Sequence, residues 1–109
     1  MVIILNAETL GRGDDVLGAK IMGSYLRTLG TIDPKPEAMV FYNAAVKLLS
    51  PQSPHLEALR ALEHAGVDLL ACVTCLEHFQ LVGNLAVGHV SNMREIVQRT
   101  AQAAKVITA

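Results

Sequence analysis

Short apolar runs alternate with longer segments of helical periodicity throughout this chain. The runs at 2–5, 38–42 and 67–71 are almost entirely apolar and include β-branched residues, as is typical of strands buried on both faces. Such strands belong to parallel sheets, because the helices that connect parallel strands cover the two faces of the sheet. The alternation therefore predicts an α/β chain and argues against an all-helical or all-β fold.

The segments between these runs carry signals for helix ends. Asp14 and Asp15 suit the positive end of a helix dipole, and Gly30 is a typical C-terminal stop. Asn92 is followed three residues later by Glu95, a pattern typical of a helix start. The expected helices span 14–30, 53–66 with Ser53 as cap, 74–81 and 92–101. Two further strands are expected over 85–90 and 105–108. The segment 43–50 is either a short helix or a structured loop.

This order of elements predicts one domain over residues 1–109. We expect a three-layer α/β/α sandwich with a mainly parallel five-stranded sheet and right-handed crossovers. Local patterns do not encode the order of the strands, so a flavodoxin-like arrangement is the default. Because 51% of the residues are hydrophobic, the chain has enough apolar material for a compact core.

Charge and hydropathy exclude several classes of function. The net charge is −1 and no segment concentrates Lys or Arg, so a nucleic-acid-binding face is not expected. The apolar runs are far shorter than a membrane span requires. The N-terminal Met-Val-Ile-Ile-Leu-Asn lacks the basic region and the cleavage site of a signal peptide, and we therefore expect a cytoplasmic protein.

A Cys-x-x-C motif at the end of the third expected strand carries the strongest chemical signal. Cys72 falls where the strand gives way to a helix, and a thiol beside a helix N-terminus has a lowered pKa. The thiolate is the form that attacks sulfane sulfur or a disulfide, and Cys75 lies one helical turn away. We therefore predict Cys72 and Cys75 as the catalytic residues.

Two alternatives to thiol chemistry remain for this motif. The cysteines could be small buried hydrophobes at a strand end. A metal site needs about four ligands, whereas the chain offers one Cys-x-x-C, and His78 would point away from a strand-end thiol. We predict neither a metal nor another cofactor.

Further polar residues follow the expected strand ends, which meet at one edge of a parallel sheet. Arg12 lies in a Gly-Arg-Gly loop and is a candidate anion contact near the thiols, although that loop also suits a simple turn before a helix. Lys47 could lower a thiol pKa through its charge, or it could be an ordinary exposed lysine. With Asn43 and Thr74, these residues are the predicted substrate-binding set.

Four stretches of the chain resemble the DsrE/DsrF-like family of sulfur-relay proteins, and in particular the DsrE-like domain of YedF-type proteins of selenium metabolism. They are residues 10–18, 40–48, 66–76 and 85–93, in family order. The resemblance implies a three-layer α/β/α fold, self-association into oligomers, and a cysteine after the third strand that accepts sulfur as a persulfide. Cys72 occupies that position, and Cys75 completes the Cys-x-Thr-Cys form of the YedF-like group.

We therefore predict a sulfurtransferase-like relay protein that accepts sulfane sulfur as a persulfide on Cys72 and passes it to an acceptor. YedF-type proteins also carry an N-terminal TusA-like domain with a Cys-Pro motif, which these 109 residues do not contain. A separate TusA-like carrier is then the expected donor or acceptor. The alternatives are a non-catalytic oligomeric module that binds a small ligand or a partner, and a dithiol redox protein that uses Cys72 and Cys75.

Overall fold

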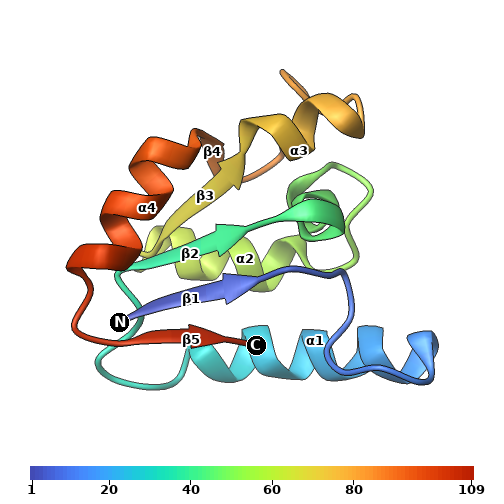
Figure 1. Ribbon diagram of the computed structural model, residues 1–109. Coiled ribbons are helices and arrows are strands. Elements are labelled where there is room, and N and C mark those ends of the chain that lie inside the picture. The colour runs from blue at the N-terminus through green and yellow to red at the C-terminus, as the bar shows by residue number, and fades with distance from the viewer.

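Five parallel strands form one sheet in the order β4-β3-β2-β1-β5 (Figure 1). The structure is a computed structural model and describes residues 1–109. The strands are β1 (Val2–Leu5), β2 (Ala38–Phe41), β3 (Asp68–Cys72), β4 (His89–Ser91) and β5 (Val106–Thr108). The predicted α/β/α sandwich with a parallel five-stranded sheet is confirmed.

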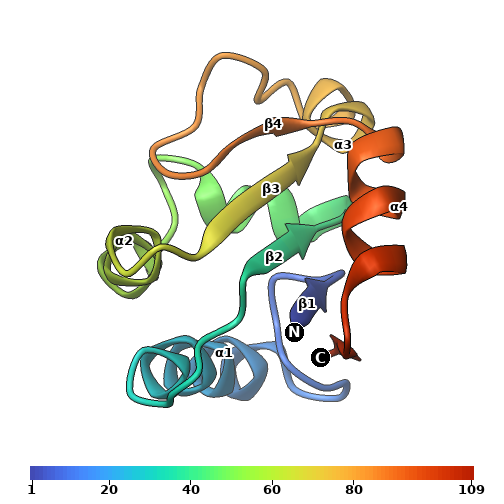
Figure 2. The same cartoon turned by 90° about the vertical axis from the view of Figure 1, so that its left-hand side faces the viewer.

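The strand order differs from the 2-1-3-4-5 order of flavodoxin that was the default expectation. From β1 the chain adds β2, β3 and β4 in one direction, and β5 then returns to the other side of β1. Right-handed crossovers in opposite directions place their helices on opposite faces of the sheet. Accordingly, α1 (Asp15–Leu29) and α2 (Leu56–His64) lie on one face and α4 (Met93–Gln102) on the other, as Figure 2 shows.

The larger of two apolar clusters lies under α1, α2 and the 3₁₀ helix η1 (Asn43–Leu49). It contains 18 buried residues, and Leu26 of α1 and Leu59 of α2 are completely inaccessible. Burying a side chain of this size contributes about 1.5–3 kcal/mol relative to leaving it exposed. This face of the sheet therefore supplies most of the hydrophobic stabilisation.

The second cluster is much smaller and lies between the sheet and α4. It contains six buried residues, and Ile96 is its only member from a helix. Cys72 of β3 belongs to this cluster, whereas Ile4 and Tyr42 at its border are only partly buried. The sheet is thus well covered on one face and thinly covered on the other.

The caps predicted for two helices are present. Asp14 Oδ1 accepts the backbone N–H of Leu17 at 2.8 Å, and Asn92 Oδ1 accepts that of Glu95 at 2.9 Å. These bonds satisfy donors at the helix start that have no partner within the helix. The segment 43–50, predicted as a short helix or a loop, forms η1.

Three predicted boundaries were wrong. The helix expected over 74–81 is α3 (Val73–His78), which ends three residues earlier, and Gln80 beyond it has a left-handed backbone with φ at +58°. Ser53 does not cap α2, because its Oγ accepts the N–H of His55 at 3.2 Å within a turn that precedes the helix. Residues 85–88 are not part of β4, because the N–H groups of Ala86 and Val87 donate to the carbonyl of Leu49 instead of a neighbouring strand. Gly88, with φ at +74°, then turns the chain into the strand.

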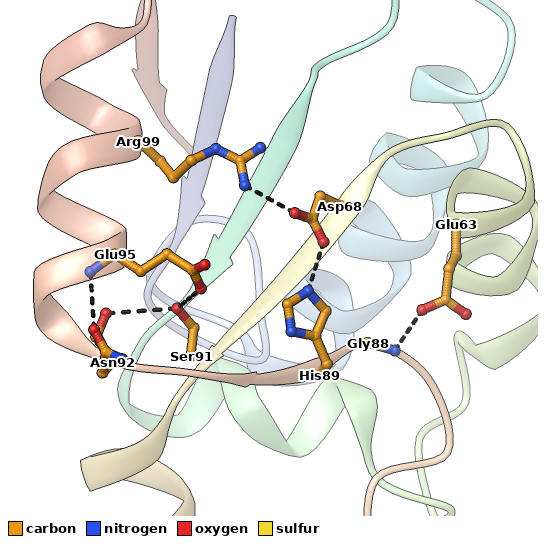
Figure 3. A network of polar contacts seen from close by, with 8 residues as sticks. All are labelled: Glu63, Asp68, Gly88, His89, Ser91, Asn92, Glu95 and Arg99. Atoms are coloured by element: carbon orange, nitrogen blue, oxygen red, sulfur yellow. Dashed lines mark hydrogen bonds and ion pairs between the residues drawn. The ribbon is translucent and has the colours of Figure 1, made fainter.

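A polar network ties β3, the edge strand β4 and α4 together (Figure 3). Asp68 accepts hydrogen bonds from His89 Nε2 at 2.6 Å and from Arg99 Nη1 at 2.8 Å. The hydrogen bond to Asp68 raises the pKa of His89. Burial alone would raise the pKa of Asp68, but the bonds from Arg99 and His89 outweigh it and lower that pKa. The network is therefore strongest while His89 is protonated.

We expect the contribution of His89 to stability to fall as the pH rises. A histidine whose pKa is raised by folding stabilises the folded chain fully at a pH below its pKa in the unfolded chain, about 6.5. This stabilisation is lost as the pH rises through the higher pKa of the folded chain. His89→Gln should therefore lower the free energy of unfolding more at about pH 6 than at about pH 8.5. Urea denaturation at the two pH values measures this difference. His64→Gln, at an exposed position without an acidic partner, is the matched control. An equal loss in the free energy of unfolding for His89→Gln at both pH values would contradict the prediction.

Candidate functional site

Cys72 is the last residue of β3 and the N-cap residue of α3 (Val73–His78). Its backbone pairs in register with Ser91 of β4, and its side chain packs in the small cluster with Ile96. Only 3% of the residue is exposed. The predicted position at a strand-to-helix junction is therefore correct, but solvent hardly reaches this sulfur.

Cys75 lies in the first turn of α3 and is more exposed than Cys72. Its Sγ accepts a hydrogen bond from the backbone N–H of Asn43, with the nitrogen 3.0 Å from the sulfur. Burial raises the pKa of the Cys75 thiol, the Asn43 N–H lowers it in part, and the nearby Cys72 thiol raises it further. Both cysteines are free thiols, and we call them the thiol pair.

Asn43, whose N–H contacts Cys75, has a left-handed backbone. Its φ is +51°, and its Oδ1 accepts the N–H of Ala44 at 2.8 Å. Asn tolerates this conformation better than other residues with a side chain, because the short amide bonds locally to the backbone. The predicted site residue Asn43 is thus brought to the thiol pair, through its main chain rather than its side chain.

Tyr42 is a neighbour of the thiol pair that the sequence did not indicate. Its hydroxyl donates to Met93 Sδ of α4 at 3.8 Å. Burial raises the pKa of Tyr42, and the negative charge that Cys72 and Cys75 carry as thiolates raises it further. The signal that could have identified Tyr42 is its place directly after β2, since β2 and β3 end at the same edge of the sheet.

Thr74 and Arg12 form no side-chain hydrogen bond or ion pair with the thiol pair. Thr74 is exposed on α3 between the two cysteines. Arg12 is exposed in the loop that follows β1, two strands from β3, and forms neither a hydrogen bond nor an ion pair. Their proposed roles in substrate binding remain predictions.

Lys47 lines a cavity and forms no hydrogen bond or ion pair with the thiols. The cavity has a volume of about 630 Å³ and is bordered by the loop after β1, by α1, by η1 and by the segment after α3. Lys47 Nζ lies 3.7 Å from Glu8 Oε1 and 4.5 Å from the centre of the Phe79 ring. Glu8 and Phe79 are far from Lys47 in sequence, so no local pattern could have linked them. η1 contributes to both features, with Asn43 at the thiol pair and Lys47 at the cavity.

The structure contains no group of three His, Cys, Asp or Glu side chains that could hold a metal ion. None of its helices has the length and apolar character needed to cross a membrane. The site brings together the thiol pair and the adjacent Asn43 N–H.

A model of the DsrE/DsrF-like family matches residues 19–109, and the chain belongs to this family. The family is associated with sulfur relay in general. The closer relation to the YedF-type group remains a prediction. No curated protein sequence shows significant similarity to the chain.

Solved structures share the fold over almost the whole chain. The ychN protein from E. coli aligns with a TM-score of 0.70 at 18% identity, covering 99% of this chain and 97% of its own. MTH1491 from Methanobacterium thermoautotrophicum, a protein of unknown function, aligns with a TM-score of 0.72 at 21% identity, covering 99% and 96%. At these identities the likeness establishes the fold.

We expect an alkylating reagent to modify Cys75 before Cys72. Cys75 is partly exposed and Cys72 is 3% exposed, so brief treatment with iodoacetamide should label Cys75 about tenfold faster or more. Because burial raises the pKa of Cys75, its rate should continue to rise with pH beyond the ordinary thiol value. Peptide mass mapping at several pH values measures both effects, and faster labelling of Cys72 in the folded chain would contradict them.

Two substitutions of Asn43 provide matched controls for this measurement. Asn43→Gly keeps the left-handed backbone accessible and should leave the pH profile of Cys75 unchanged. Asn43→Ala disfavours that backbone by about 1–2 kcal/mol, which should weaken the N–H···S bond and move the profile to higher pH. Equal profiles for the two variants would show that the Asn43 N–H does not influence the thiol.

Proposed function

We propose that this chain is a sulfurtransferase-like relay protein that accepts sulfane sulfur as a persulfide at the thiol pair and passes it to an acceptor. The observation that carries the proposal is the placement of two free thiols at the carboxyl end of β3, with a backbone N–H on the more exposed sulfur. Membership of a family associated with sulfur relay supports it.

The difference in burial suggests an order for the two cysteines. Sequence analysis assigns the persulfide to Cys72, but a donor meets Cys75 first because Cys72 is 3% exposed. We therefore propose that sulfur enters at Cys75 and is then transferred to Cys72. The buried position would protect the persulfide from small thiols in solution.

Each transfer is an exchange that needs no external oxidant. The Cys75 thiolate attacks the terminal sulfur of the donor persulfide, a new S–S bond forms, and the donor leaves as a thiolate. The Cys72 thiolate then attacks the outer sulfur on Cys75, and Cys75 leaves as a thiolate that the Asn43 N–H stabilises. Delivery to an acceptor thiol follows the same steps in reverse.

Loading of cysteine variants with sulfur tests this order. After incubation with glutathione persulfide, the wild-type chain should gain about 32 Da, the mass of one sulfur atom. Cys72→Ser should retain the extra sulfur on Cys75, Cys75→Ser should load about tenfold more slowly or worse, and the double variant should not load. Intact-mass and peptide mass spectrometry give the amount and the position.

Two results would contradict the proposal in different ways. Loading of Cys75→Ser at the wild-type rate would make Cys72 the entry point. Stoichiometric release of sulfide with a disulfide between Cys72 and Cys75, and no retained sulfur, would instead favour the dithiol redox function.

We further propose that the chain exchanges sulfur with a TusA-like carrier and that it self-associates. Support for self-association comes from three exposed apolar residues, Met93 and Val97 of α4 and Val106 of β5, and we propose that they form an apolar patch on the thinly covered face of the sheet. These side chains are 52%, 52% and 41% exposed. Exposed apolar side chains that gather on one face are typical of interaction surfaces.

Light scattering at micromolar concentration tests self-association. We expect a mass that is a multiple of the 11.7 kDa chain, and Val97→Glu should lower it because the charge enters the patch. Glu57→Lys, on α2 of the opposite face, is the control and should leave the mass unchanged. A wild-type mass of one chain would contradict the proposal.

A further inference from the structure

Neither cysteine of the thiol pair lines the cavity beside η1. Its volume of about 630 Å³ falls within the range of small-molecule sites. Three regions of the chain that are distant in sequence form its walls: the loop after β1 with the start of α1, η1 with the following turn, and the segment after α3. It lies at the edge where the strands end, which is where open parallel sheets bind ligands.

Lys47 offers a cation to this cavity with unused hydrogen-bond donors. Its Nζ is 4.5 Å from the centre of the Phe79 ring and 3.7 Å from Glu8 Oε1, which is too far for a hydrogen bond. Both partners lie beside the ammonium group, and its N–H groups form no hydrogen bond within the chain. An anionic group in the cavity would satisfy them.

The rest of the lining argues against a ligand that is only an anion. Glu8 and Asp15 both border the cavity, so its lining contains two acidic residues and one lysine. His55 also borders it, but burial and then the charge of Arg27 lower the pKa of His55, so this side chain adds no positive charge near neutral pH. The ligand must therefore bring a positive group as well as a negative one.

Apolar side chains complete the cavity. Leu48 and Leu81 line it together with the ring of Phe79. They offer a surface for an aliphatic group, next to the charged residues Lys47 and Glu8.

We propose that this cavity binds an amino acid with an aliphatic side chain, whose carboxylate contacts Lys47 and whose ammonium group contacts Glu8 and Asp15. The aliphatic side chain would pack on Leu81 and Phe79. The proposal does not depend on the relay of sulfur, since neither the cavity nor such a ligand contains a thiol.

Titration of the ¹⁵N-labelled chain with three molecules of matched shape tests the proposal. L-leucine carries both charges, 4-methylpentanoate carries only the carboxylate, and 3-methylbutylamine carries only the ammonium group. Leucine should shift the amide signals of Ala44, Lys47 and Phe79 saturably, with a dissociation constant in the millimolar range or below, and each analogue should bind about tenfold more weakly or worse. Equal binding of either analogue, or no saturable shift with leucine, would overturn the proposal.

Charge-neutralising variants identify the groups that bind. Lys47→Gln and Glu8→Gln should each weaken leucine binding about tenfold, and Lys47→Gln should leave binding of 3-methylbutylamine unchanged. Lys20→Gln and Glu77→Gln, at exposed positions outside the cavity, are the matched controls and should bind leucine as the wild type does. Unaltered leucine binding in both cavity variants would overturn the assignment of the charged groups.

Discussion

The parallel register between β2 and β3 determines how the thiol site is built. Phe41 lies opposite Ala71, and both side chains pack in the larger cluster, so a shift of one residue would move one of them to the other face of the sheet. With this register, Tyr42 and Asn43 leave β2 at the level where β3 ends in Cys72. The Asn43 N–H can therefore reach the sulfur of Cys75 in the first turn of α3.

The unequal cover of the two sheet faces gives the two cysteines different surroundings. Cys72 points into the thin cluster under α4, where the neighbouring strands and Ile96 exclude solvent. Cys75, one turn later, packs at the borders of both clusters and stays partly exposed. One sulfur is thus available to a partner and the other is sheltered, which is the basis for the proposed direction of transfer.

Local patterns predicted those features that depend on neighbours in the sequence. The buried run of β1, the caps Asp14 and Asn92, and the position of Cys72 at the end of β3 are of this kind. Features that depend on tertiary contacts were not predictable in the same way. The bond from Asn43 to Cys75 spans 32 residues, and the irregular backbone of 85–88 results from bonds to Leu49. The burial of Cys72 likewise depends on α4. The face of the sheet that α4 covers follows from the strand order, which local patterns do not encode.

Rapid-quench trapping in the wild-type chain tests the proposed direction of transfer most directly. The chain is mixed with a persulfide donor, alkylated after increasing delays and mapped by peptide mass spectrometry. The extra sulfur should be on Cys75 at the earliest times and on Cys72 later, with no lag in the total amount bound. Sulfur that appears first on Cys72 would contradict the role assigned to the exposed thiol.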